Sequence, residues 1–148
     1  MLNIHKYIKN SLNNANGKQR ILYAVSFIWF VLANLAYFSC INDSQHILDA
    51  IDEIHTYLIA ADLSIFIANS MMRFACIKQM EIIGEASNHL SAELKSKFSD
   101  IEWAQIVGMR NVFAHEYFGI DSSLVWEIIK NDIPELKEKI DHILKSIQ

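Results

Sequence analysis

The chain has 148 residues, of which 52% are apolar and 20% are charged, with four glycines and one proline. This length supports one domain with a substantial core, and the composition excludes a disordered or turn-rich protein. The two cysteines, Cys40 and Cys76, exclude a disulfide framework or a paired-cysteine metal site and fit a reducing compartment.

The charges are unevenly distributed along the chain. Residues 1–42 contain four basic residues and no acidic residue, whereas residues 43–148 contain nine basic and seventeen acidic residues, a balance of −8. An acidic body of this kind does not bind nucleic acid passively. Any nucleic-acid chemistry must therefore come from a local cationic site.

Residues 1–42 are expected to form an N-terminal extension. Within it, residues 21–41 are apolar and uncharged over a length that can cross a bilayer as a helix. In one interpretation they are a membrane helix, with the N-terminus in the cytoplasm according to the distribution of basic residues. A second interpretation is a secretory signal, which the long polar segment before the run and the poor processing site at residues 37–40 disfavour. In the third, the start codon is assigned too early, and this part is translated upstream sequence.

Residues 43–148 are expected to form one helical domain. Asp43 or Ser44 is predicted to cap its first helix, and a second, longer helix is predicted around Gly84. Glycine in a helix interior costs up to about 1 kcal/mol relative to alanine, so Gly84 indicates close approach of a neighbouring helix. Apolar residues recur at helical spacing in both segments: Ile47, Leu48, Ile51, Ile54 and Leu58 in the first, and Phe74, Ile77, Met80, Ile83, Ala86 and Leu90 in the second.

Two further helices are predicted towards the C-terminus. Ser99 or Asp100 is expected to cap the first, which carries Trp103, and Ser122 or Ser123 is expected to cap the second. The body shows no strand-like alternation. The predicted fold class is therefore all-α, an antiparallel four- to five-helix bundle preceded by an extra apolar N-terminal helix.

The residues with the densest chemistry lie between residues 109 and 121. Here Arg110 supplies a permanent cation, Asn111 an amide, His115 a titratable ring and Tyr117 a phenol. Five residues of regular helix turn through roughly 500°, so Arg110 and His115 would point about 140° apart on an unbroken helix. They converge only if the helix distorts or ends between them, or if a second copy of the chain supplies one of the two.

The spacing of Arg110, His115 and Tyr117 resembles the R-x-x-x-x-H-x-Y motif of the HEPN superfamily, and specifically its HepT-like toxins, the partners of minimal nucleotidyltransferases. The likeness covers about residues 43–147. It is carried by residues 47–54, 81–86, 106–111, 117–121, 125–126 and 131–134, in that order along the chain. Residues 1–42 match nothing in the family pattern.

The resemblance implies a HEPN-like fold and a metal-independent endoribonuclease toxin of a type VII toxin–antitoxin system. It implies a homodimer in which the two motifs meet in a cleft between protomers, with Arg110 and His115 as the catalytic pair. It also implies that a nucleotidyltransferase antitoxin transfers AMP to Tyr117 and silences the toxin. These expectations place the protein in the cytoplasm.

The chemistry of the same residues agrees with that activity. RNA carries its own nucleophile in the 2′-hydroxyl group, so cleavage needs a base and a cation but no obligatory metal. His115 can exchange a proton near neutral pH, Arg110 matches phosphate oxygens, and Asn111 can orient the histidine or the phosphate. The expected product carries a 2′,3′-cyclic phosphate. We expect no cofactor and no metal.

Other functions remain open. Arginine, histidine and tyrosine near a helix end are often capping or packing groups. In one alternative the protein is a non-catalytic substrate- or nucleotide-binding partner of a nucleotidyltransferase. In the other, residues 21–41 anchor it in the inner membrane as a helical interaction module.

Overall fold

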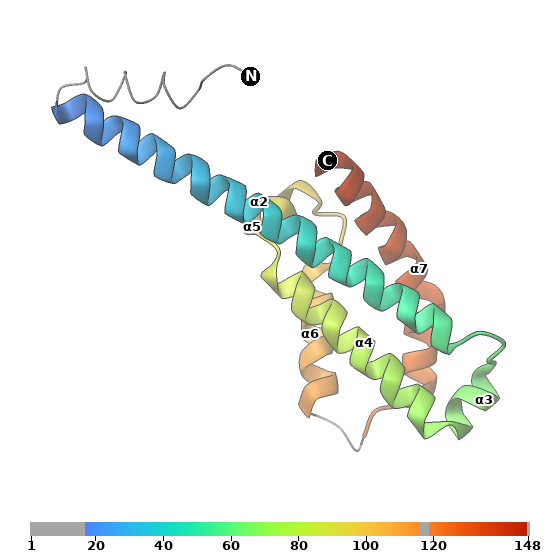
Figure 1. Ribbon diagram of the computed structural model, residues 1–148. Coiled ribbons are helices and arrows are strands. Elements are labelled where there is room, and N and C mark those ends of the chain that lie inside the picture. Colours follow the sequence, from blue (N-terminus) through green and yellow to red (C-terminus); the bar gives the residue numbers. More distant parts are fainter. Residues whose placement is uncertain (1–16, 116–118, 148) are drawn as a thin grey trace. The chain divides into compact units, whose positions relative to one another are not determined.

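The structure is a computed structural model that describes residues 17–115 and 119–147 (Figure 1). These residues form six helices and no strand, so the predicted all-α class is confirmed. The helices are α2 (Gly17–Tyr57), α3 (Leu63–Ala68), α4 (Ser70–His89), α5 (Ala92–Lys97), α6 (Trp103–His115) and α7 (Ser122–Ile147).

The chain divides into two compact units, Met1–Tyr37 and Phe38–Gln148. In the first unit, the described residues belong to α2, and their large apolar side chains are exposed. In the second unit, α2 continues from residue 38 to residue 57 and provides the first helix of the bundle. The predicted apolar N-terminal helix is thus the first part of α2.

The predicted helix start at Asp43 or Ser44 was wrong, because both residues lie inside α2. Asp43 is 8% exposed and accepts a hydrogen bond from the Ser39 hydroxyl group at 3.1 Å, whereas Ser44 is fully buried. Serine and aspartate favour the start of a helix only where backbone N–H groups lack partners. The apolar run supplies a helical turn before them, so no free N–H groups remain there to be capped.

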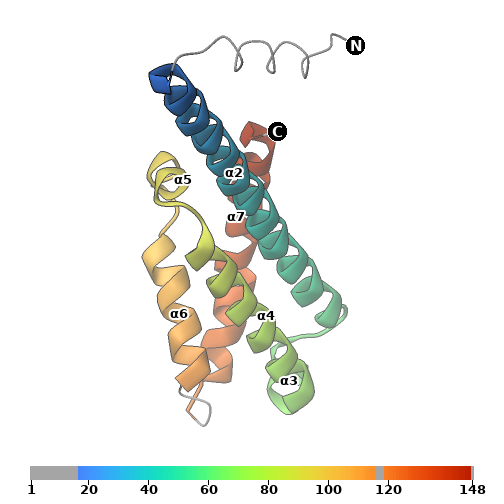
Figure 2. The same ribbon diagram turned by 60° about the vertical axis from the view of Figure 1, so that its left-hand side comes forward.

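In the second unit the most extensive helix contact is between α4 and α6, and α2 runs antiparallel to α4 (Figure 2). At one end, His89 of α4 lies beside Asp43 of α2, and at the other end the Gln79 side-chain amide donates to the Tyr57 hydroxyl group at 3.1 Å. α3 packs against both α4 and α7. An ion pair between Lys137 and Asp52 joins α7 to α2.

The predicted apolar stripes form the core of this unit. Burial of each isoleucine contributes roughly 1.5–3 kcal/mol relative to an exposed side chain. Phe74 is the exception among the predicted core residues, since it is 45% exposed. The fully buried apolar residues come from α2, α3, α4 and α7: Ile47, Ile51, Ile54, Phe66, Cys76, Met80, Ile83, Ile140 and Ile143.

Helix α6 begins later than predicted. Neither Ser99 nor Asp100 caps it, because the first helical residue is Trp103 and the Glu102 carbonyl group accepts the early backbone bonds. The Trp103 indole N–H donates to the Phe98 carbonyl group at 3.0 Å. This buried bond ties the start of α6 to the end of α5.

Helix α7 is capped by Asp121, whose carboxylate accepts a hydrogen bond from the Ser123 backbone N–H at 2.8 Å. The prediction that Ser122 or Ser123 caps this helix was wrong by one or two residues. An aspartate cap also forms at α3, where the Asp62 carboxylate accepts from the Ile65 N–H at 2.9 Å. The hydrogen bond from the Ile65 N–H is the main cause of the lowered pKa of Asp62, and the hydrogen bond from the Ser64 hydroxyl group is the second.

Candidate functional site

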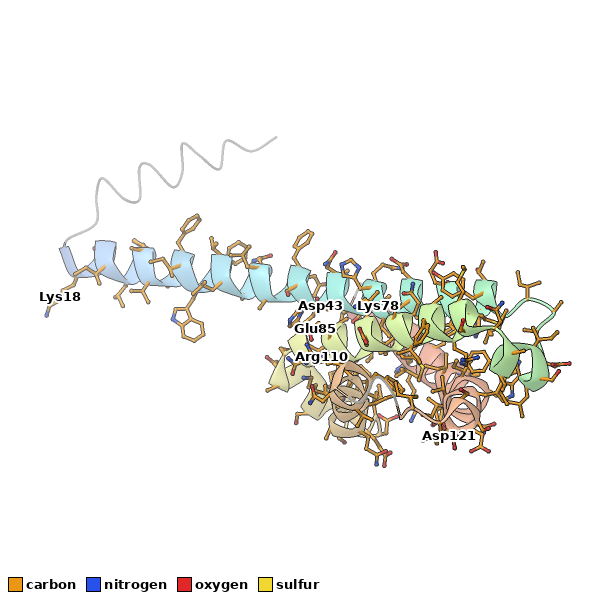
Figure 3. All side chains as sticks on the ribbon, turned by 90° about the horizontal axis from the view of Figure 1, so that it is seen from below. Lys18, Asp43, Lys78, Glu85, Arg110 and Asp121 are labelled. Atoms are coloured by element: carbon orange, nitrogen blue, oxygen red, sulfur yellow. The ribbon has the colours of Figure 1, made fainter. Side chains whose placement is uncertain are left out.

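Arg110 projects from α6 towards α4, and Figure 3 shows it close to Glu85. The Arg110 Nε lies 3.2 Å from Glu85 Oε2, and its Nη1 donates to Asn111 Oδ1 at 3.0 Å. The Arg110 side chain is 40% exposed. The guanidinium group is therefore fixed along one edge while part of it remains open to solvent.

Gly84 explains how α4 comes so close to Arg110. A Cβ atom at Gly84 would overlap the Cβ of Arg110 and lie 3.1 Å from the Ile106 carbonyl oxygen. The close helix approach predicted at Gly84 is confirmed. Because Glu85 is the next residue, this approach also brings its carboxylate to the guanidinium group.

Glu85 continues the network towards α2. Its Oε1 lies 3.2 Å from His89 Nε2, one helical turn further along α4. The other ring nitrogen of His89, Nδ1, lies 3.9 Å from Asp43 Oδ1. Ser39 holds the second carboxylate oxygen of Asp43. A chain of polar side chains thus runs from α6 through α4 to α2.

The sequence pattern does not reveal this network, because Glu85 and His89 carry no predicted role and Asp43 is predicted at a helix start. The available signal was the i, i+4 spacing of Glu85 and His89 directly after a glycine in a helix interior. Their partners on α2 and α6 are distant in sequence, so the spacing alone does not reveal the network.

His115 is the last residue of α6, and its side chain lies outside the described residues. Since α6 is unbroken from Trp103 to His115, the helix neither distorts nor ends between Arg110 and His115. The two positions therefore lie about 140° apart around the helix axis. One undistorted copy of α6 does not bring them to the same face.

The remaining predicted site residues divide between described and undescribed parts of the chain. Asn111 is exposed and bonded to Arg110, so in this structure it contacts the cation. Tyr117 lies outside the described residues.

A cleft of about 650 Å³ lies between α7 and the segment that includes α6, and Arg110 does not line it. Its apolar lining comes from isoleucine, leucine and methionine side chains, and Lys139 is the one basic residue among those that line it. The Lys139 amine lies 2.8 Å from Glu135, and this hydrogen bond is the main cause of its raised pKa. The acidic residues of the cleft would repel RNA phosphates. They are Asp100, Glu102, Asp132 and Glu135.

Cys76 is poorly placed to act as a nucleophile. It is fully buried, and burial raises its pKa to about 11. The thiolate is the nucleophilic form of cysteine, so Cys76 is unreactive near neutral pH. Among the described residues, no group of three or more His, Cys, Asp or Glu side chains is placed to hold a metal ion.

Residues 47–143 match the family model described as Ribonuclease HepT-like. This match confirms the resemblance to HepT-like proteins and covers the helices that carry Arg110, Glu85 and His89. The apolar part of α2 before residue 47 lies outside the match. No solved structure matches the chain significantly.

Several curated relatives share this region. A putative RNase of Methanocaldococcus jannaschii is 39% identical over 95 residues, which cover 64% of this chain and 87% of that protein. A probable ribonuclease HepT of Thermococcus cleftensis is 34% identical over 101 residues, or 68% of this chain and 92% of the relative. A gamma-glutamylcyclotransferase and putative RNase of M. jannaschii is 37% identical over 103 residues, or 70% of this chain but 46% of the longer relative.

The Gly84 contact predicts opposite effects for two glycine substitutions. Gly84→Ala should lower the free energy of unfolding by about 1–3 kcal/mol, because the new methyl group forces α4 and α6 apart. Gly108→Ala, on α6, should raise the free energy of unfolding by about 0.4–1 kcal/mol, because no atom of the described residues lies within 4 Å of its added Cβ and alanine favours the helix. Urea denaturation followed by circular dichroism measures both. Equal effects for the two variants would contradict the close contact at Gly84.

Proposed function

This chain belongs to the ribonuclease HepT-like family, and we propose that it is a metal-independent endoribonuclease toxin of a type VII toxin–antitoxin system. The observation that carries the proposal is the half-exposed Arg110 guanidinium, held by Glu85 within the region that matches the family. The names of the relatives, a putative RNase and a probable ribonuclease HepT, support the same class of reaction.

The proposed reaction uses the RNA's own 2′-hydroxyl group as the nucleophile. His115 removes the 2′-hydroxyl proton, the 2′-oxygen bonds to phosphorus, and the bond from phosphorus to the 5′-oxygen breaks. Arg110 stabilises the charge that gathers on the phosphate oxygens. The 5′-oxygen takes up a proton, leaving a 2′,3′-cyclic phosphate on one fragment and a 5′-hydroxyl on the other.

We propose that two copies of the chain complete the site. Arg110 and His115 occupy positions about 140° apart on an unbroken α6, so one copy of the helix cannot present both to the same RNA phosphate. In a dimer, Arg110 of one copy can meet His115 of the other. Such a contact, in which the same residues of both copies meet, is the usual geometry of a twofold dimer. It would also place two Arg110 side chains along one RNA strand.

RNA cleavage in the presence of EDTA tests the catalytic pair. Arg110→Ala and His115→Ala should each lower the cleavage rate by about 10²–10⁴-fold, because each removes a group that acts in the transition state. Lys78→Ala and His55→Ala serve as matched controls, since both residues are exposed and distant from Arg110 in the sequence. Both controls should cleave at the wild-type rate.

The products of the same assay are equally informative. Analysis of the fragment ends should find 2′,3′-cyclic phosphates. Fragments that carry only 3′-hydroxyl ends would rule out attack by the 2′-oxygen. Full activity of His115→Ala would instead favour the non-catalytic binding partner.

We further propose that Tyr117 is the site at which a nucleotidyltransferase antitoxin attaches AMP. Tyr117 is two residues from His115, so a nucleotide linked to it adds negative charge and bulk beside the catalytic pair. This modification would exclude RNA. The spacing in the family motif supports the assignment.

Replacement of Tyr117 separates modification from catalysis. With a minimal nucleotidyltransferase and ATP labelled at the α-phosphate, Tyr117→Phe should take up no label and retain cleavage within a few-fold of wild type. Tyr57→Phe, whose hydroxyl group contacts Gln79, is the matched control and should be labelled normally. Label retained on Tyr117→Phe would assign the modification to another residue.

A second candidate function, a membrane-anchored form, rests on the apolar run of residues 21–41, most of which lies in the first unit. Residues 21–41 carry no charge and span about 31 Å as a helix, close to the roughly 30 Å of a bilayer core. The candidate span within Ile21–Tyr57 has a mean hydropathy of 1.9, and its most apolar window is 0% buried. The basic residues before this run favour an N-terminus in the cytoplasm and a body on the opposite side. Cytoplasmic RNA cleavage and membrane insertion therefore place the body in different compartments.

Fractionation of cells that express the full chain distinguishes the two locations. An anchored chain should stay in the membrane pellet after alkaline extraction, and Leu32→Arg should release it, because arginine at the centre of a span costs about 2.5–3.5 kcal/mol. Asn42→Arg, beyond the end of the run, should remain in the pellet. Recovery of the wild-type chain in the soluble fraction would reject the anchor.

A further inference from the structure

We propose that Glu85 is a positioning residue that aims the Arg110 guanidinium group at the RNA phosphate, and that His89 and Asp43 hold Glu85 in place. The proposal rests on the proposed nuclease function of Arg110. It gives Glu85, His89 and Asp43 a role in the reaction without contact with the substrate.

The orientation of the guanidinium group is the first argument. Arginine has five N–H donors in a planar fork, and it binds phosphate best with two parallel hydrogen bonds. Glu85 takes the Nε side at 3.2 Å, and Asn111 accepts one bond from Nη1 at 3.0 Å. No contact from another described residue engages Nη2. The outer edge formed by Nη1 and Nη2 is thus available to a phosphate.

The rigidity of the support is the second argument. A half-exposed arginine loses much side-chain entropy when it is held in one conformation, so an unassisted Arg110 would sample several rotamers. Glu85 follows Gly84, where α4 and α6 approach each other closely, so its backbone is fixed relative to Arg110. An exposed ion pair of this kind contributes little to stability. Its main effect is therefore on the geometry of Arg110.

Glu85 is also supported from the side opposite Arg110. Glu85 Oε2 faces Arg110 while Oε1 faces His89 Nε2 at 3.2 Å, so both carboxylate oxygens have a partner. His89 Nδ1 faces Asp43 on α2 at 3.9 Å, and Asp43 is buried and bonded to Ser39. The carboxylate of Glu85 is thus held from both sides. Figure 3 shows Asp43, Glu85 and Arg110 along the same side of the bundle.

Glu81 provides the internal comparison. It lies one turn before Glu85 on α4 and pairs at 2.8 Å with Lys78 of the same helix. Among the described residues, no hydrogen bond or ion pair joins Glu81 to α6 or α2. Glu81 therefore carries the same side chain as Glu85 on the same helix but forms no hydrogen bond or ion pair with Arg110. This makes it the matched control.

A positioning role predicts a particular division between kcat and KM. The negative charge of Glu85 opposes phosphate binding, so its removal should leave KM unchanged or lower it. Loss of the fixed geometry should lower kcat, because misplacement of a catalytic group by about 1 Å can cost 10²-fold. A residue that only stabilises the fold would not lower KM.

The experiment measures kcat and KM on a short RNA for single and double variants of the full chain, with thermal unfolding of each. Glu85→Ala should lower kcat at least about tenfold without raising KM. Glu81→Ala should change kcat by less than about twofold. The double variant Glu85→Ala with Arg110→Ala should be no slower than Arg110→Ala alone, because Glu85 acts through Arg110.

Two conservative variants distinguish the effect of the Glu85 side-chain length from the effect of its charge. They apply even if Glu85→Ala does not fold. Glu85→Gln keeps the side-chain length and an oxygen near Arg110 Nε but removes the charge, and it should retain most of kcat. Glu85→Asp keeps the charge but is one methylene shorter, and it should lower kcat almost as far as Glu85→Ala. The reverse order would show that charge alone matters and would overturn the positioning role.

The outcomes distinguish this inference from the proposed function. If Arg110→Ala is inactive but Glu85→Ala cleaves at the wild-type rate, Glu85 does not position Arg110 and the nuclease proposal stands. Additive losses in the double variant would likewise overturn the inference. If Arg110→Ala keeps full activity, the proposed function itself fails.

Discussion

The site depends on one close contact, the approach of α4 to α6 at Gly84. Any side chain at this position would overlap the Cβ of Arg110, so the contact exists only because the residue is glycine. Glycine at this position lowers the intrinsic stability of α4 by as much as about 1 kcal/mol relative to alanine. In return, a carboxylate on α4 reaches a guanidinium group on α6 at 3.2 Å. Helix packing and the proposed site therefore depend on the same residue.

Much of the fold could be predicted because apolar periodicity reports directly on burial. The predicted stripes through Ile51 and Ile83 are buried except at Phe74, and Gly84 marks the helix contact. The helix starts were predicted less well. Ser44 is a good capping residue, but capping preference acts only on free N–H groups, and the apolar run before it continues the helix. The residues around Ser44 do not by themselves show that the helix begins well before them.

The candidate site was predictable only in part. Arg110 stands out because the motif gathers unusual chemistry in a short stretch. Glu85, His89 and Asp43 do not stand out, because acidic and imidazole side chains on helix surfaces are common and their partners lie on other helices. A spacing of four residues on α4 identifies neighbours on one helix face, but it does not identify what that face meets. Only the tertiary arrangement links them to Arg110.

Charge limits how such a site can bind RNA. The body from residue 43 onwards carries a balance of −8, so phosphates meet a repulsive surface everywhere except at local cations. At Arg110 the adjacent Glu85 offsets part of the positive charge. The ion pair therefore weakens the attraction of Arg110 for phosphate while it fixes the orientation of the guanidinium group. A dimer that brings two such arginines together would restore attraction without an extensive basic surface. The same dimer must join two acidic bodies, so its contact has to rest on apolar packing and local complementarity rather than on overall charge.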